Sequence, residues 1–166
     1  MRIIISDIPD EGLDLDLEEK FEAEEVGLLS PVKAHLELTK AHSEIIIVGN
    51  LNAELELECS RCLKKYRQVM EVPVNVVYHP VTEIGHDKHG LKDDEMDMGF
   101  YQGDELDLKE LISEQVLLNI PMKPLCDENC RGICSRCGTD LNTGACSCET
   151  KKIDSRLEVL KKLLEK

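Results

Sequence analysis

The sequence predicts an α+β fold. An antiparallel β-sheet, or a partly closed barrel, carries one or two helices and is followed by a C-terminal cysteine-rich metal-binding tail with a terminal helix. Three observations lead to this prediction. Apolar and charged residues alternate over several stretches between residues 13 and 78, which is the pattern of half-buried strands. Residues 107–119 have helical spacing instead, and six of the eight cysteines lie between Cys126 and Cys148.

Charge is distributed unevenly over the 166 residues. Residues 1–120 contain 11 Lys/Arg and 27 Asp/Glu, a formal charge of −16, whereas residues 121–166 contain nine and seven, a charge of +2. The overall charge of −14 argues against a uniformly basic nucleic-acid-binding protein. We therefore predict a mainly antiparallel β domain over 1–121 and a metal-binding tail over 122–166, docked on the first part.

The sequence shows neither a signal peptide nor a membrane-spanning segment, and these two observations predict the compartment. The apolar start at Ile3-Ile4-Ile5 is too short for a signal peptide. No apolar run approaches the roughly 20 residues that a membrane span needs. We therefore expect a cytoplasmic protein without a membrane partner, in which the thiols stay reduced.

Residues 13–48 predict a strand followed by a hairpin. Leu13, Leu15 and Leu17 alternate with acidic residues, and the alternation resumes with apolar residues at even positions over 32–38. Residues 40–43 are expected to form a turn before a β-branched strand over 44–48. Gly49-Asn50 is expected to end that strand.

A second hairpin is predicted over 51–78. Apolar residues occupy the odd positions of 53–59 and the even positions of 72–78, so each strand has one apolar face. Pro73 has no N–H to donate, which predicts that the returning strand is an edge strand or an irregular one. Cys59 and Cys62 then fall at the tip of the hairpin, where a tight turn can bring two thiolates to one metal ion.

The rest of the chain predicts a loop and two helices. Residues 79–105 contain glycine and many acids, and we expect an acidic, solvent-exposed loop. Asp107 can cap a helix over 107–119 whose apolar stripe contains Leu108, Leu111, Ile112 and Val116. Residues 154–166 are expected to form the terminal helix.

The eight cysteines predict two structural zinc sites. Thiolates in groups of four select Zn²⁺, or less often iron, and a site closed by four cysteines is structural. We expect a local site formed by Cys134, Cys137, Cys146 and Cys148. The second site would join the hairpin tip to the tail through Cys59, Cys62, Cys126 and Cys130. Other pairings stay open, including one that leaves Cys59 and Cys62 free, as do disulfides and free thiols.

Basic residues flank the cysteines. The candidate nucleic-acid-binding set is Arg61, Lys64, Lys65, Tyr66, Arg67, Arg131 and Arg136. If the two cysteine segments share a metal, these residues converge on one face of an otherwise acidic chain. Such a face could contact RNA phosphates, with Tyr66 stacking on a base. The alternative interpretation is that the cations only compensate the thiolate charge.

Four segments carry a resemblance to a known family. They are Leu57–Leu63 with its Cys-x-Arg-Cys, Glu114–Pro121, Cys130–Asn142 and Asp154–Leu157. Together they resemble the YceD family, the large ribosomal RNA subunit accumulation proteins, over residues 32–166. Ser135 and Ser155 stand where the family usually has proline, and both changes are compatible with a turn and a helix start.

The resemblance implies a non-enzymatic role in accumulation of 23S ribosomal RNA, and hence in large-subunit biogenesis, without a small-molecule substrate. Two mechanisms stay open. The basic face binds ribosomal RNA, or the acidic body binds a basic large-subunit ribosomal protein and keeps it soluble. The alternative function is a zinc-stabilised protein–protein adaptor or a nucleic-acid-binding regulator unrelated to ribosomes. No nucleophile–base pair, phosphate-binding glycine loop or open metal site indicates an enzyme.

Overall fold

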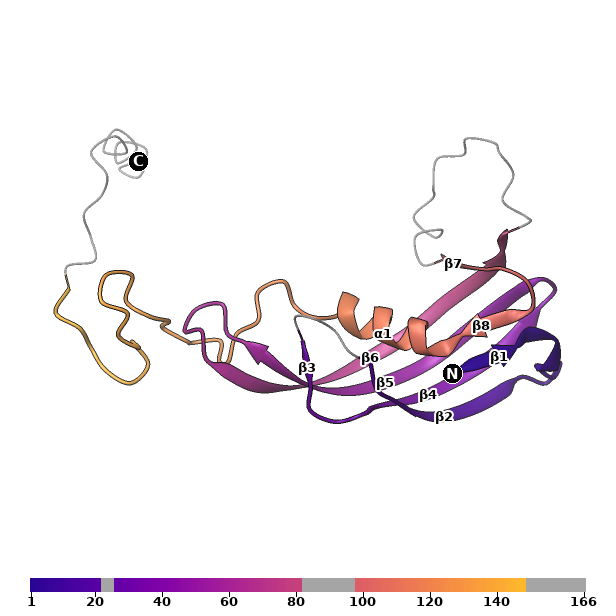
Figure 1. Ribbon diagram of the computed structural model, residues 1–166, viewed down its shortest axis with the longest axis horizontal. Helices are drawn as coiled ribbons and strands as arrows, with labels where there is room; N and C mark the ends of the chain where they lie inside the picture. The colour runs from indigo at the N-terminus through magenta and orange to yellow at the C-terminus, as the bar shows by residue number, and fades with distance from the viewer. Residues whose placement is uncertain (22–25, 82–97, 149–166) are drawn as a thin grey trace, which may run out of the picture. The chain divides into compact units, whose positions relative to one another are not determined.

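A computed structural model describes residues 1–21, 26–81 and 98–148 of the chain. The chain divides into two units (Figure 1). The first contains Met1–Leu57 and Tyr66–Met122, and the second contains Glu58–Lys65 and Lys123–Lys166. The second unit thus includes the hairpin tip, which the predicted division at residue 121 placed in the first domain. The predicted terminal helix over 154–166 lies outside the described residues.

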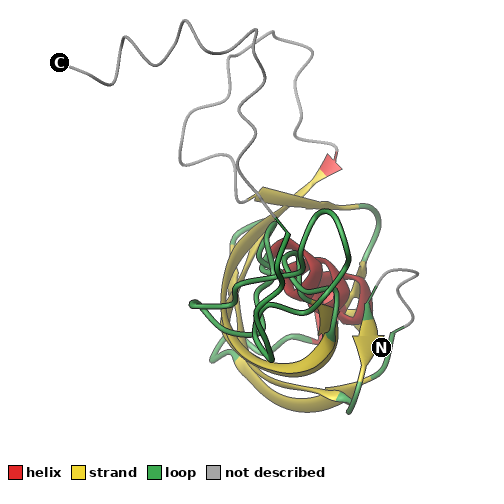
Figure 2. Ribbon diagram, turned by 90° about the vertical axis from the view of Figure 1, so that its left-hand side faces the viewer, coloured by secondary structure: helices red, strands yellow, loops and turns green. Residues whose placement is uncertain are grey.

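The first unit is built on a six-stranded sheet. Its strands are β2 (Leu13–Glu19), β3 (Gly27–Leu28), β4 (Val32–Ala41), β5 (Glu44–Glu58), β6 (Lys65–Pro80) and β7 (Met98–Tyr101). Their order is β2-β4-β5-β6-β7, with β3 beside β5. The β2–β4, β4–β5 and β3–β5 pairs are antiparallel, whereas β7 runs parallel to β6. Over the described residues the sheet is therefore mixed and curved, and it does not close into a barrel (Figure 2).

The alternation of apolar residues produces the core. The even positions of β4 from Val32 to Leu38 are buried, as are the odd positions of β5 from Ile45 to Leu57 apart from Gly49. The even positions of β6 from Val72 to Tyr78 complete the inner face. The predicted strand faces are confirmed. In Figure 2 the sheet curves around the helix, so that this face and the helix share one core.

The predicted end of a strand at Gly49-Asn50 is wrong. β5 continues through both residues for 15 residues in all, and Gly49 pairs with Leu36 of β4. A Cβ at Gly49 would lie 2.0 Å from the carbonyl oxygen of His35. Glycine is therefore needed at this position because the backbones of β4 and β5 approach closely there, and not because the chain turns.

One helix, α1 (Leu108–Leu118), packs on the sheet. The side chain of its N-cap, Asp107, accepts a hydrogen bond from the N–H of Lys109 at 3.0 Å. The predicted stripe is buried, at Leu108, Leu111, Ile112 and Val116. Both the cap and the stripe are confirmed.

Two further strands and a short 3₁₀ helix place the N-terminus beside the start of the helix. β1 (Arg2–Ile4) pairs with β8 (Glu105–Asp107) in a separate two-stranded sheet, and η1 (Ile5–Asp7) follows β1. The predicted loop over 79–105 is shorter than expected, because β7 and the start of β8 lie within it. Its residues 82–97 lie outside the described part.

Pro73 lies in a part of β6 that β7 does not cover. β7 pairs with β6 only at Val77–Pro80, so Pro73 is outside the paired part of that edge among the described residues. Within the same described residues, no helix is both long and apolar enough to cross a membrane.

Candidate metal centres

The turn at the hairpin tip contains Cys59 and Cys62 and is closed by two backbone hydrogen bonds. The N–H of Cys59 donates to the carbonyl of Lys64 at 3.0 Å, and the N–H of Leu63 donates to the carbonyl of Cys59 at 2.9 Å. These bonds close a tight loop that turns both thiols to one side. Leu63 adopts φ 59°, the left-handed region that favours glycine.

The tail repeats this turn. The N–H of Cys134 donates to the carbonyl of Thr139, and the N–H of Gly138 donates to the carbonyl of Cys134, both at 2.9 Å. Gly138 has φ 72° and occupies the position of Leu63. Both turns have the sequence Cys-Ser-Arg-Cys. This repeat is visible in the sequence and is a signal that the two turns share one conformation.

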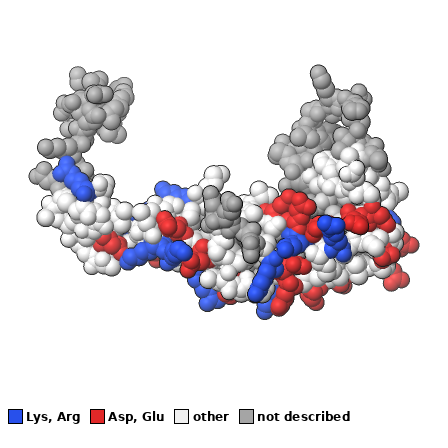
Figure 3. Space-filling view, viewed as in Figure 1, with Lys and Arg blue, Asp and Glu red and all other residues white. Residues whose placement is uncertain are grey.

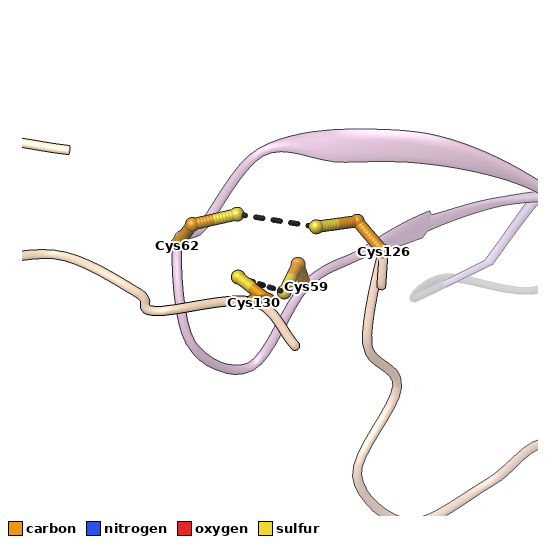
Figure 4. A group of neighbouring side chains, drawn as sticks. All are labelled: Cys59, Cys62, Cys126 and Cys130. Atoms are coloured by element: carbon orange, nitrogen blue, oxygen red, sulfur yellow. Dashed lines mark hydrogen bonds between the residues drawn. The ribbon is translucent and has the colours of Figure 1, made fainter. Parts of the chain in front are cut away.

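The first centre joins the hairpin tip to the tail. It contains the four thiols of Cys59, Cys62, Cys126 and Cys130, whose sulfurs all lie within 4.8 Å of one another (Figure 4). The Sγ atoms of Cys59 and Cys130 are 3.8 Å apart, and those of Cys62 and Cys126 are 3.6 Å apart. A tetrahedral Zn²⁺ with bonds of about 2.3 Å to sulfur has sulfur–sulfur edges of about 3.8 Å. The spacing therefore fits a tetrahedral metal ion and is far too long for disulfides.

The second centre is local to the tail. It contains Cys134, Cys137, Cys146 and Cys148, again with all sulfurs within 4.8 Å of one another. Only Cys134 of this set is buried, whereas three ligands of the first centre are buried. Each cluster could hold a metal ion, and the two groups have the same members as the preferred partition of the sequence analysis.

The thiols of each cluster differ in acidity. Backbone hydrogen bonding at Cys126, with further bonds at Cys62 and Arg61, lowers the pKa of the Cys59 thiol to about 6. The hydrogen bond with Cys62, together with burial, raises the pKa of Cys126 to about 12. Without a cation, one thiolate therefore keeps its neighbours protonated. A divalent ion would supply the charge that lets all four ionise.

The second cluster has the same arrangement. The hydroxyl of Thr139 lies 3.1 Å from the Sγ of Cys137 and lowers the pKa of this thiol to about 6. The hydrogen bond to Cys137 raises the pKa of Cys148 to about 12. Both clusters thus fit a metal with an all-sulfur donor set.

The second unit has no apolar core of its own in its described part. The buried apolar residues within 58–65 and 123–148 are Cys59, Cys62, Cys130 and Cys134. Burial of aliphatic side chains therefore cannot hold these segments together, whereas a metal ion in each cluster could cross-link them.

Polar contacts hold the tail against the hairpin tip. The guanidinium of Arg61 donates to the carbonyls of Glu128 and Cys130 at 3.1 and 2.8 Å. The N–H of Ser60 donates to the carbonyl of Pro124 at 2.8 Å. Gly132 has φ 75°, and a Cβ there would meet the carbonyl oxygen of Arg61 at 2.8 Å. Glycine is therefore required for this close contact.

The candidate nucleic-acid-binding residues are placed differently from one another. Arg61 is engaged as above. Lys64 forms an ion pair with Asp140 at 2.6 Å, and Arg67 forms one with Glu54 at 2.6 Å. Tyr66 and Arg67 belong to the first unit, whereas the other members belong to the second. The remaining arginines, at positions 131 and 136, are exposed, and their guanidinium groups have no partner within the described residues.

The class of protein is an α+β sheet domain joined to a unit with two four-thiol clusters, each of which could hold a metal ion. The family model described as "Large ribosomal RNA subunit accumulation protein YceD" matches residues 47–164. The chain belongs to this family.

Curated relatives are similar over different shares of their length. An uncharacterised protein of Mycobacterium leprae is 25% identical over 115 residues, which cover 68% of this chain and 50% of that protein. The uncharacterised YlbN of Bacillus subtilis is 25% identical over 157 residues, 94% of this chain and 87% of YlbN. The chloroplastic large ribosomal RNA subunit accumulation protein YCED homolog 1 of Zea mays is 25% identical over 148 residues, 75% of this chain and 50% of that protein.

The chain thus spans about half the length of the mycobacterial and maize relatives. No solved structure gives a significant match to it.

Proposed function

We propose that this chain is a non-enzymatic factor in biogenesis of the large ribosomal subunit that supports accumulation of 23S ribosomal RNA in the cytoplasm. Membership of the YceD family carries the proposal, since the family model matches residues 47–164. The name of the maize relative refers to the same process. All eight cysteines fall within the matched region, which supports a link between the clusters and this function.

The proposed metal is Zn²⁺ at both centres. Four thiolates around a tetrahedral cavity suit Zn²⁺ and leave no open position for a substrate or water. When bound, the ion would cross-link segments that lack an apolar core. The cysteines hold the ion, and Arg61 and Gly132 hold the two segments close together.

The proposed direct partner is a basic ribosomal protein of the large subunit. The described residues of the first unit contain 17 acidic and 6 basic residues, a formal charge of −11. Figure 3 shows acidic side chains gathered over this unit. Such a surface attracts a basic protein and repels RNA.

Direct binding of ribosomal RNA is the second candidate, and Arg131 and Arg136 favour it. They are the two arginines of the predicted set whose side chains are unengaged within the described residues. Charge reversal of both should weaken RNA binding and reduce its salt dependence if RNA is the partner. Reversal at Arg67, which pairs with Glu54, is the matched control.

The test is depletion of the protein in its own cells, followed by measurement of the ratio of 23S to 16S ribosomal RNA. The ratio should fall and be restored by the intact chain and by Ser60→Ala, but not by the double variant Cys59→Ser, Cys62→Ser. Crosslinking followed by nuclease treatment should retain a basic ribosomal protein. An unchanged ratio after depletion would contradict the proposed function and leave the adaptor or regulator alternative.

A further inference from the structure

A groove in the first unit separates one face of α1 from β6 and β7. It consists of two hollows of about 580 and 380 Å³ that share Tyr78, Gly99 and Glu114 among their lining residues. Gly99 lies directly on the ring of Tyr78, because an added Cβ would be 2.4 Å from its Cε1. The absence of a side chain at Gly99 therefore lets the backbone of β7 approach the Tyr78 ring in the middle of the groove.

The helix wall of the groove presents one residue per turn. Glu110, Glu114 and Leu118 are four residues apart, so their side chains follow one face at intervals of about 6 Å. Two like charges at this spacing lower helix stability. The fold does not offset this repulsion with an internal cation: both carboxylates are exposed, and neither has an ion pair among the described residues.

The other carboxylates of the groove are already paired. Arg2 contacts Glu105 at 3.5 Å and Asp107 at 3.4 Å. Among the described residues, the groove thus keeps two negative charges without an ion pair, at Glu110 and Glu114. Burial is the main cause that raises the pKa of Tyr78, which lines the groove, to about 12. The negative charges of Glu114 and Glu110 raise this pKa further.

The groove has apolar surface as well. Leu118 is 77% exposed and Phe100 is 53% exposed. Val76, Tyr78 and Leu111 also line the groove. The helix wall therefore offers two carboxylates followed by an apolar side chain.

We propose that this groove binds an extended basic peptide segment of a partner protein, with the pattern cation-x-cation-x-apolar. Alternate side chains of an extended chain are about 6.6–6.8 Å apart, which matches the spacing of Glu110, Glu114 and Leu118. The cations would pair with the two carboxylates, and the apolar residue would cover Leu118. The inference rests on the proposed function, because it specifies how a basic ribosomal protein would be held.

The test measures binding of a fluorescent peptide, Arg-Ser-Arg-Ser-Leu-Ser-Arg-Ser-Arg, to the full zinc-loaded chain by anisotropy. This peptide contains the pattern in both chain directions. A peptide of the same composition with its four arginines adjacent is the sequence control. The double variant Glu110→Gln, Glu114→Gln should weaken binding at least tenfold, and Leu118→Ser at least threefold.

The matched charge control is the double variant Asp14→Asn, Glu37→Gln. These two exposed carboxylates are neighbours across β2 and β4, away from the groove, and their removal should change affinity less than twofold. Equal losses in both double variants, or equal binding of both peptides, would show non-specific attraction and overturn the proposal.

No binding of the alternating peptide would overturn it as well. The assay does not depend on the level of ribosomal RNA. If the peptide does not bind but depletion lowers the ratio of 23S to 16S ribosomal RNA, only the groove proposal fails. If depletion leaves this ratio unchanged, the proposed function fails.

Discussion

Asn142 donates a hydrogen bond from its Nδ2 to the Sγ of Cys130, 3.4 Å away. Its Oδ1 accepts from the N–H of Arg131 at 2.7 Å, which fixes the orientation of the amide. Asn142 lies in the segment between the cysteines of the second centre, whereas Cys130 is a ligand of the first. The loop of one centre thus stabilises a sulfur of the other.

Replacement of Asn142 should weaken metal binding at the first centre. Loss of an outer-shell hydrogen bond typically lowers metal affinity by about 10- to 100-fold. We expect at least a tenfold loss for Asn142→Ala in chelator competition with Zn²⁺. Asn129→Ala is the control, since Asn129 is exposed beside Cys130 and its side chain has no hydrogen bond among the described residues. Equal affinities of the two variants would show that the contact is unimportant.

Leu63 should be replaceable by glycine with a gain in stability. A non-glycine residue in the left-handed region costs about 1 kcal/mol or more, and Leu63 is 56% exposed, so it loses little burial. We expect Leu63→Gly to stabilise the zinc-loaded chain by about 1 kcal/mol in denaturant titrations.

The reciprocal change tests the same cause in the second turn. A Cβ added at Gly138 would have no atom within 4 Å, so only the φ of 72° opposes a substitution there. Gly138→Ala should destabilise the zinc-loaded chain by about 1 kcal/mol. Destabilisation by Leu63→Gly would indicate that the leucine side chain contributes packing.

Removal of the metal should unfold the second unit and leave the first. In the described part of the second unit the buried side chains are those of cysteines, whereas the sheet and α1 share an aliphatic core. After treatment with a chelator, hydrogen exchange should become fast in residues 58–65 and 123–148 and stay slow in β4 and β5. Slow exchange at Cys130–Asn142 in the metal-free chain would contradict this expectation.

His35 provides a reporter for the first unit. The Nδ1 of His35 lies 2.8 Å from the Oδ1 of Asp16, on the exposed face of the sheet. This hydrogen bond raises the pKa of His35 above 6.5. A raised folded-state pKa favours folding below 6.5, and this contribution is lost as the pH rises through the folded value. NMR titration should find the raised pKa with and without metal, and Asp16→Asn should return it toward 6.5.

Strand faces and the start of the helix were predictable, because residues close together in the sequence determine them. Period-two alternation identified the buried faces of β4, β5 and β6, because a strand presents successive side chains to opposite sides. Asp107 identified the start of α1, because its carboxylate accepts a backbone N–H within the same turn. Gly49 was misread, because a glycine looks the same in sequence whether it ends a strand or admits a neighbouring backbone.

The membership of the two clusters was also predictable from the number of cysteines. Eight cysteines make two sets of four, and a group of four thiols can bind a metal ion in many different folds. By itself, the sequence determined the residue types, their local periodicity and the two turns with their cysteine pairs. Only the tertiary structure decided which distant groups meet: β1 with β8 over a separation of about a hundred residues, β7 parallel to β6, and Asn142 with Cys130. The physical reason is that alternation and capping act within a few residues, whereas these contacts depend on how the chain closes long loops around a shared core or a shared metal.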